Sequence, residues 1–445
     1  MTNTYEPVIG LEVHVELKTK SKMFCGCSAD QFGSKPNTQT CPVCLGLPGA
    51  LPVPNKKAIE WCIKLGLALN CTIPEESKFD RKNYFYPDLA KGYQISQYDK
   101  PLCEHGWMQL KERKVRIARV HQEEDTGKLQ HVTVDGERLT LVDFNRCGVP
   151  LVEIVTEPDF HSIDEVDQYV KKLQRIVRYI DISGADMEKG TMRLEPSISL
   201  RKVGSTDLPP YRVELKNINS FRFVRKAIEY EIQRQSEMLD NGETPIQQTR
   251  GWSESKNATL PQRSKEDAHD YRYFPEPDIP PMHFTREFVE EIKKTIPTLP
   301  DEYETEMKKY GLGEQDIFVL TENAQTASYF IGTATIASQT VADSSGAAVY
   351  KQVANAMVNK RIDYSQLTPK EFISRIQNQE KENTVSTDII QSTVESVLAA
   401  NQKAVDDYKK GKTSVIMFLV GMVKKELKGK GDASFIEAEL KKRLG

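Results

Sequence analysis

Polar and apolar side chains alternate along residues 8–17, VIGLEVHVEL, near the start of the chain. Successive side chains of a β-strand point to opposite faces of its sheet, so the alternation predicts a strand with one apolar and one polar face. The apolar face carries Leu11, Val13, Val15 and Leu17, and the polar face carries Glu12, His14 and Glu16. Carboxylates around an imidazole can bind a divalent ion. The strand is therefore either the floor of a catalytic site or an edge strand with its polar face in water.

Similar patterns continue through the first two thirds of the chain. Alternation predicts further strands at residues 115–120, 131–134, 138–144, 192–201 and 211–215. The dipeptide Asp135-Gly136 between two of these strands suits a tight hairpin turn. Apolar residues at steps of three and four predict helices at residues 56–69, 162–180 and 220–239. This order indicates an α+β fold, in which helices pack on one face of an antiparallel sheet.

The strand patterns fade near residue 295, after the proline-rich segment PEPDIPP at residues 275–281. Proline removes a backbone donor and interrupts regular pairing. Beyond this point the periodicity predicts short helices at residues 301–310, 324–331, 347–359, 369–377, 387–401 and 414–427. We therefore expect a sheet-bearing body at residues 1–294, an all-α domain at residues 295–385 and a small helical tail at residues 386–445.

Charge and targeting signals narrow the possible functions. The 445 residues carry a net charge of −3, which excludes a wholly basic nucleic-acid coat. From Asn401 onward, eleven Lys and Arg stand against six Asp and Glu, so a basic tail follows an acidic body. The N-terminus lacks a basic and then apolar signal, and no apolar run approaches the ~20 residues of a membrane span. We therefore expect a cytoplasmic protein that does not enter a membrane.

Four of the eight cysteines lie in two close pairs near the first strand, Cys25-Gly-Cys27 and Cys41-Pro-Val-Cys44. Such pairs on tight turns can present four sulfurs to one tetrahedral Zn²⁺. The alternatives are free thiols and an iron-sulfur cluster, which suits the single short loop less well. A zinc ion held by four thiolates has no open position, so the expected role is structural.

Three consecutive acids, Glu123-Glu124-Asp125, follow the predicted strand at residues 115–120. Adjacent carboxylates repel one another, and a bound cation would offset that repulsion. If this strand lies beside the first, Glu124 can face Glu12 and His14. Oxygen ligands with one imidazole favour Mg²⁺ or Mn²⁺ over zinc. An exposed acidic turn is the alternative.

Two later strands carry carboxylates beside basic or amide groups. Glu195 has Arg193 and Arg201 near it, and Glu214 is followed by Lys216 and Asn217. A polyphosphate site requires metal-binding acids next to cationic groups. Charge pairing on a solvent-exposed sheet face would give the same pattern.

A phosphate-binding loop is absent from the sequence, because Asp406 replaces the glycine that should precede Lys412 by six positions. Any ATP would then bind on the sheet through metals and side chains. The segment at residues 78–88 interleaves bases with aromatics, and it supplies Arg81, Lys82 and Tyr84 as candidates for phosphate and base contacts. Aromatic packing under a loop would explain the same segment.

Several long motifs resemble one known family. VIGLEVHVELKTKSKMF, ESKFDRKNYFYPD, GYQISQYDKP, HQEEDTGKL, GVPLVEIVTEPD, VELKNINSF and DYRYFPEPDIP occur in this order along the chain. Together they resemble the B-subunit family of aspartyl/glutamyl-tRNA amidotransferases, and the helical remainder is similar to that family's helical domain and tRNA-binding tail.

The resemblance implies a glutamine synthetase-like sheet cradle that uses ATP and Mg²⁺. In this family the enzyme phosphorylates the side-chain carboxylate of Glu on mischarged tRNA(Gln), or of Asp on mischarged tRNA(Asn). An amidase subunit supplies ammonia, and the heterotrimer is completed by a small third subunit. The family's metal-binding residues correspond to Glu12, His14 and Glu124, with Glu123 adjacent. Catalytic roles are expected for Lys82 and Glu214 as well.

One motif departs from the family pattern. Where the family reads Arg-Cys-Asp-x-Asn, this chain reads Arg193-Leu-Glu195-Pro-Ser197. The longer Glu195 side chain can still reach a cation, but the ion position could shift. Two other functions compete with the amidotransferase: a zinc-knuckle RNA-binding module without catalysis, and a free-standing ligase for small amino acids.

Overall fold

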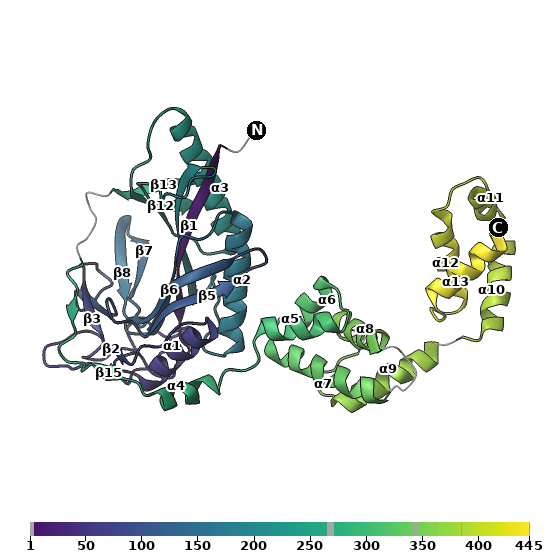
Figure 1. The fold of residues 1–445 in the computed structure, drawn as a ribbon, viewed down its shortest axis with the longest axis horizontal. Coiled ribbons are helices and arrows are strands. Elements are labelled where there is room, and N and C mark those ends of the chain that lie inside the picture. Colours follow the sequence, from purple (N-terminus) through teal and green to yellow (C-terminus); the bar gives the residue numbers. More distant parts are fainter. Residues whose placement is uncertain (1–3, 265–270, 341–345, 361, 384, 445) are drawn as a thin grey trace. The chain divides into compact units, whose positions relative to one another are not determined.

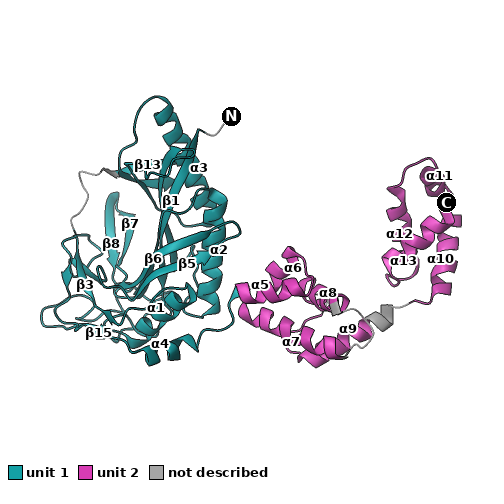
Figure 2. Ribbon diagram, viewed as in Figure 1, with its two compact units in different colours: residues 1–300 teal, residues 301–445 magenta. Residues whose placement is uncertain are grey.

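The computed structural model describes residues 4–264, 271–340, 346–360, 362–383 and 385–444. The chain divides into two compact units, residues 1–300 and residues 301–445 (Figure 2). Asp270, the first residue of the DYRYFPEPDIP motif, lies outside the described residues.

An eight-stranded sheet forms the centre of the first unit (Figure 1). Its strands lie in the order β13 (Ala258–Ser264), β12 (Gln248–Ser253), β11 (Val213–Lys216), β10 (Met192–Lys202), β1 (Tyr5–Glu16), β9 (Pro150–Thr156), β6 (Lys114–Glu124) and β5 (Cys103–Gln109). The prediction of an α+β fold is confirmed, but the sheet is mixed, because β11 and β12 pair in parallel. The helix α3 (Phe221–Asp240) connects these two strands, and such a crossover returns the chain to run in the same direction.

The apolar side of β1 faces the main hydrophobic core of this unit. Leu11, Val13 and Val15 are buried there with side chains from α1 (Lys56–Ala68), α2 (Ile163–Tyr179) and α3. Ser162 begins α2 by accepting a hydrogen bond from the Glu165 amide at 3.2 Å. Because the helices and apolar side chains occupy this face, the polar side chains of β1 lie on the other face of the sheet.

Three smaller sheets complete the unit. They are β14–β3–β4 (Phe274–Pro275, Asp80–Asn83 and Tyr93–Ser96), β15–β2 (Met282–His283 and Glu76–Ser77) and the hairpin β7–β8 (Lys128–Val134 and Glu137–Asp143). The predicted hairpin is confirmed, since Asp135 and Gly136 have φ angles of 51° and 85°. The helix α4 (Arg286–Lys293) lies in the same unit.

The second unit is helical and contains two separate hydrophobic cores. The first is formed by α5 (Pro300–Lys309), α6 (Glu314–Leu320), α7 (Ala324–Thr340), α8 (Gly346–Val358) and α9 (Pro369–Asn383). The second is formed by α10 (Thr387–Ala400), α11 (Gln402–Lys409), α12 (Val415–Glu426) and α13 (Ala433–Leu444). All six helices predicted for this region are present, and α6, α11 and α13 were not predicted. Among the described residues, no helix has both the length and the apolar character needed to cross a membrane.

Candidate active site

The strand register of the sheet aligns acidic side chains on its polar face. His14 of β1 lies opposite Glu153 of β9, and Glu12 lies opposite Glu195 of β10. One histidine and five glutamates form what we call the acidic row, namely Glu123, Glu153, His14, Glu12, Glu195 and Glu214. The row falls into two groups of three, and the ligand atoms within each group lie within 4.8 Å of one another.

The first group consists of His14, Glu123 and Glu153. The His14 Nε2 atom lies 3.5 Å from Glu123 Oε1 and 3.5 Å from Glu153 Oε2. Burial lowers the pKa of His14, but the charges of Glu153 and Glu123 outweigh burial and raise the pKa to about 9. Adjacent ligands of an octahedral ion with ~2.1 Å bonds are about 3 Å apart. The three side chains therefore fit one oxygen-preferring divalent ion after a small contraction.

His121 supports this first group from the neighbouring strand β6. Its Nε2 atom lies 3.2 Å from Glu153 Oε2, and its side chain is 3% exposed. Burial raises the pKa of Glu153, but His121 and His14 outweigh that effect and hold the pKa well below its usual value. Glu153 is therefore a carboxylate with a fixed orientation.

The second group consists of Glu12, Glu195 and Glu214. Burial, followed by the charges of Glu153, Glu195 and Glu214, raises the pKa of Glu12. Lys216 Nζ lies 2.8 Å from Glu195 Oε2 and 3.5 Å from Glu214 Oε1. One lysine offsets only part of the negative charge of three carboxylates, so this group also suits a divalent cation.

Lys82 lies on β3 of the small β14–β3–β4 sheet and brings positive charge to the first group. Burial lowers the pKa of Lys82, but the charges of Glu123 and Glu153 outweigh burial and raise it. The Nζ atom lies 4.9 Å from the centre of the Tyr271 ring and 5.9 Å from that of Tyr84. Within the described part of the chain its ammonium group has no hydrogen-bonded or ion-paired partner. An ammonium group in this state can accept an anionic ligand.

Glu124 does not join His14, contrary to the expectation that its strand lies beside the first. The strand β9 lies between β1 and β6, so the two strands are not neighbours. The carboxylate of Glu124 pairs with Lys91 and accepts a hydrogen bond from the Ile95 amide at 2.9 Å. Side chains alternate along β6, which extends through Glu124, and this alternation turns Glu123 toward His14 instead. The three acids are buried strand and strand-end residues, not an exposed turn.

The remaining basic candidates are engaged elsewhere in the unit. Arg81 forms two hydrogen bonds to Glu276, at 2.7 and 2.9 Å. Arg201 binds Glu6 at 2.7 Å, near the other end of β1.

The other candidates lie at the margins of the site. Arg193 binds Asp125 at 2.9 Å and lies 3.9 Å from Glu16. The Tyr84 hydroxyl donates to Gln94 at 3.3 Å. Asn217 is exposed, with a φ of 61°. The structure thus brings Lys82 and Lys216 to the acidic row but leaves Arg81 and Arg201 in other ion pairs.

The four paired cysteines form a separate cluster. The sulfur atoms of Cys25, Cys27, Cys41 and Cys44 lie within 4.8 Å of one another, and those of Cys41 and Cys44 are 3.9 Å apart. Four sulfurs at ~2.3 Å from a tetrahedral zinc are about 3.8 Å apart. Hydrogen bonding from Cys25 and the Cys41 amide, with the charge of Lys22, lowers the pKa of Cys44 to about 4. The cluster can therefore bind a metal ion and is compatible with zinc.

Sequence patterns missed two of the residues that the structure gathers here, Glu153 and His121. Glu153 is the one charged residue in the otherwise apolar strand PLVEIVT. Charged residues are rarely buried without a partner, so a lone carboxylate in such a strand was the available signal. His121 begins the acidic motif, but the alternation of β6 becomes apparent only once the strand is known to continue through it.

Comparisons with known proteins identify the family of the chain. Residues 7–290 match the family model described as the GatB/GatE catalytic domain, and residues 345–444 match that described as the GatB domain. The chain belongs to the GatB family. It is 45% identical to the B subunit of the aspartyl/glutamyl-tRNA(Asn/Gln) amidotransferase of Caldanaerobacter subterraneus subsp. tengcongensis, over 99% of both proteins. It is 44% identical to the protein of the same name in Thermodesulfovibrio yellowstonii, over 97% of this chain and 98% of that one.

Membership of the GatB family confirms the resemblance drawn from the motifs. The Arg193–Ser197 segment, for which the sequence analysis expects a departure from the family pattern, contributes residues to the site. Glu195 stands in the second group of the acidic row, and Ser197 lines a cavity beside that group. Lys216 donates a hydrogen bond to the Glu195 carboxylate at 2.8 Å.

Proposed function

We propose that this chain is the ATP-dependent subunit of a tRNA-dependent amidotransferase. In the proposed reaction a side-chain carboxylate oxygen of Glu-tRNA(Gln) or Asp-tRNA(Asn) attacks the γ-phosphorus of ATP, and ADP leaves. Ammonia then attacks the activated acyl carbon, the amide forms, and inorganic phosphate leaves. The observation that supports this proposal most is the acidic row with Lys82 beside it.

The donor atoms of the row would hold Mg²⁺ in the first group through His14, Glu123 and Glu153, and in the second through Glu12, Glu195 and Glu214. When bound there, Mg²⁺ supplies Lewis-acid polarisation of the phosphoryl group. His14 and Glu12 are two residues apart on β1, about 7 Å, which a triphosphate can span. The row thus provides the polyphosphate site that a phosphate-binding loop provides in other proteins.

Lys82 and Lys216 have different tasks in this proposal. Lys216 is held by Glu195 and Glu214, so it fixes the positions of both carboxylates, and its charge helps to lower the pKa of Glu195 against the effect of burial. Lys82 has its ammonium group available for the oxygens of the transferring phosphoryl group or of the substrate carboxylate. Glu124, in its ion pair with Lys91, supports the end of β6 and is not a ligand in this assignment.

The names of the relatives, which are amidotransferase subunits, support a larger assembly. We propose that an amidase subunit provides ammonia and that a cytoplasmic heterotrimer is completed by a small third subunit. The body at residues 1–294 would be a glutamine synthetase-like catalytic cradle, followed by a helical domain at residues 295–385. The basic tail at residues 386–445 would bind the tRNA, whose phosphates it complements in charge.

The direct test is amidation by the reconstituted trimer on Glu-tRNA(Gln) and Asp-tRNA(Asn), with glutamine as the donor. We expect ATP-dependent formation of Gln-tRNA(Gln) or Asn-tRNA(Asn), with one ATP hydrolysed per amide. Turnover of free glutamate without tRNA or the amidase partner would favour the free-standing ligase instead. Binding of tRNA without any ATP-dependent amidation would favour the zinc-knuckle RNA-binding module.

Zinc is proposed as the ion of the cysteine cluster, in a structural role. Elemental analysis of freshly purified protein is expected to give close to one zinc per chain. The zinc should be lost when Cys41 and Cys44 are changed to Ser, because two thiolates cannot replace four. Changing the buried Cys62 and Cys71 to Ser serves as the control and should leave the zinc content unchanged. Wild-type protein without metal would refute the site.

A further inference from the structure

The strand β6 changes its side-chain alternation at Ala118. Its pairing with β9 shifts by one residue between Ile117 and Arg119, as at a β-bulge. A bulge places two residues opposite one and interrupts the alternation of side chains. Before this point Val115 and Ile117 lie in the hydrophobic core, whereas after it Val120 does. The residues of β6 that point to the polar face are therefore Arg119, His121 and Glu123.

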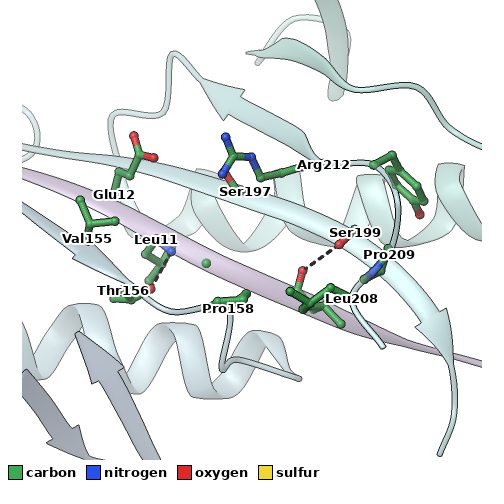
Figure 3. Close-up of a pocket in the computed structure, with 13 residues that line it drawn as sticks. Leu11, Glu12, Val155, Thr156, Pro158, Ser197, Ser199, Leu208, Pro209 and Arg212 are labelled. Atoms are coloured by element: carbon green, nitrogen blue, oxygen red, sulfur yellow. Dashed lines mark hydrogen bonds between the residues drawn. The ribbon is translucent and has the colours of Figure 1, made fainter. Parts of the chain in front are cut away.

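These three side chains lie beside the residues of β9 that share the polar face. Arg119 lies opposite Val155, and His121 lies opposite Glu153. Val155 also lies opposite Glu12 of β1, and Figure 3 shows these two residues next to each other. Without the bulge, simple alternation would direct Arg119 and His121 toward the core. The bulge thus brings an arginine and a histidine to the acidic row.

A hydrogen bond connects Arg119 with His121. The Arg119 Nε atom donates to His121 Nδ1 at 3.4 Å. A guanidinium group can only donate, so His121 Nδ1 accepts and carries no proton. The ring proton is then on Nε2, which lies 3.2 Å from Glu153 Oε2. This tautomer makes His121 a hydrogen-bond donor to Glu153.

Arg119 is not used for charge pairing in the fold. Its cross-strand neighbour on β5 is Glu104. Within the residues that the structure describes, however, Arg119 forms no ion pair, and its hydrogen bond goes to His121. The His121 side chain is only 3% exposed, so Arg119 is the partner that fixes its tautomer in place of bulk water.

The position of His121 would also suit a metal ligand. Its Nε2 atom lies 3.2 Å from Glu153 Oε2 and 4.0 Å from Glu123 Oε2. The His14 Nε2 atom lies 3.5 Å from each of the same two carboxylates. An imidazole binds a metal through a nitrogen that carries no proton. His121 can therefore compete with His14 for the ion only in the other tautomer, with its proton on Nδ1.

We propose that Arg119 is a positioning residue that keeps His121 from binding the divalent ion of the first group, an inference that rests on the proposed function. With Arg119 present, His14 is the single nitrogen ligand and the remaining ligands are oxygens. Such a set suits Mg²⁺, whereas a second imidazole favours Mn²⁺ and the later transition metals. Arg119 thereby sets the preference of the site for Mg²⁺.

The experiment uses the full chain with ¹⁵N-labelled histidine. Pulsed EPR of bound Mn²⁺ counts the imidazole nitrogens coupled to the ion, and competition with Mg²⁺ gives the ratio of the two affinities. We expect one coupled nitrogen in the wild type and two in Arg119→Met. Because a lost partner of a metal ligand changes metal affinity by about tenfold or more, the preference for Mn²⁺ over Mg²⁺ should rise about tenfold in this variant.

Three further variants separate this effect from a loss of structure. Arg119→Lys retains a side chain that can only donate, so it should behave as the wild type does. Arg116→Met removes an exposed arginine of the same strand, which pairs with Asp159, and should leave the ion preference unchanged. In a His121→Gln background, where no second imidazole exists, adding Arg119→Met should leave the preference unchanged as well.

The other outcomes overturn the inference in distinct ways. If Arg119→Met keeps one coupled nitrogen and the wild-type preference, Arg119 does not position His121, while the proposed function stands. Equal weakening of both ions, with a lower melting temperature, would show that Arg119 only stabilises the fold. Two coupled nitrogens in the wild type would make His121 a ligand. If the wild type binds neither ion, the proposed function fails, and the inference with it.

Discussion

Replacing His14 with Ala is expected to lower the rate of ATP-dependent amidation by the reconstituted trimer about 1,000-fold or more. The variant loses the imidazole nitrogen that lies 3.5 Å from both Glu123 and Glu153. Without this imidazole, the divalent ion loses one ligand and is no longer held in position between the two carboxylates. Metal stabilisation of a phosphoryl group is worth several kcal/mol, which corresponds to about three powers of ten in rate.

The matched control is His131→Ala, which removes an imidazole from the exposed hairpin β7–β8. It should leave amidation unchanged. Affinity for the mischarged tRNA, measured by filter binding, should stay within twofold of wild type in both variants, because the acidic row carries no tRNA-binding charge. A His14→Ala trimer with undiminished amidation would refute the catalytic role of the row.

The first strand shows how much of this site a sequence pattern can predict. Alternation alone placed Leu11 and Val13 in the core and Glu12 and His14 together on the opposite face, and the burial of the strand agrees. The pattern works here because side-chain direction in a strand depends only on the backbone. The pattern does not predict the environment of Glu16. Burial, together with the nearby charge of Asp125, raises the pKa of this carboxylate to about 9.

The order and register of the strands could not be predicted from this alternation. β9 lies between β1 and β6 because it pairs with both strands, and its partners in β1 are more than 100 residues away in the sequence. A shift of one residue along a strand exchanges its faces, so the choice between Glu123 and Glu124 depended on the register of β6. The resemblance implied Glu124 as a metal ligand, whereas the register of β6 places Glu123 beside His14. The two assignments differ by one position.

The cysteine cluster, unlike the strand pairing, could be predicted from the sequence. Cys25, Cys27, Cys41 and Cys44 are close in sequence, so two short turns are enough to gather their sulfurs. Glu153 needed the complete sheet before its neighbours His14 and His121 could be recognised. Local constellations can thus be predicted from spacing, whereas a site assembled from five strands requires the fold.

Replacing Lys82 with Met is expected to lower kcat for amidation about 100- to 1,000-fold, while KM for ATP changes little. The ammonium group lies close enough to Glu123 and Glu153 for their charges to raise its pKa, yet it is not held by any ion pair in the described residues. Such a positive charge stabilises the transition state, in which negative charge moves between ATP and the substrate carboxylate. Loss of one preorganised donor at that point typically costs a factor of this size.

The controls separate this effect from loss of folding. Methionine has a similar length and no charge, so the charge of the half-buried Lys82 is removed without leaving a cavity, and the melting temperature should not fall. Lys128→Met, on the exposed hairpin, should retain the wild-type rate. Lys82→Arg keeps the charge but changes its shape, so it should recover only part of the activity. Full activity in Lys82→Met would mean that the charge serves the acidic row and not the reaction, and the proposed role of Lys82 would be withdrawn.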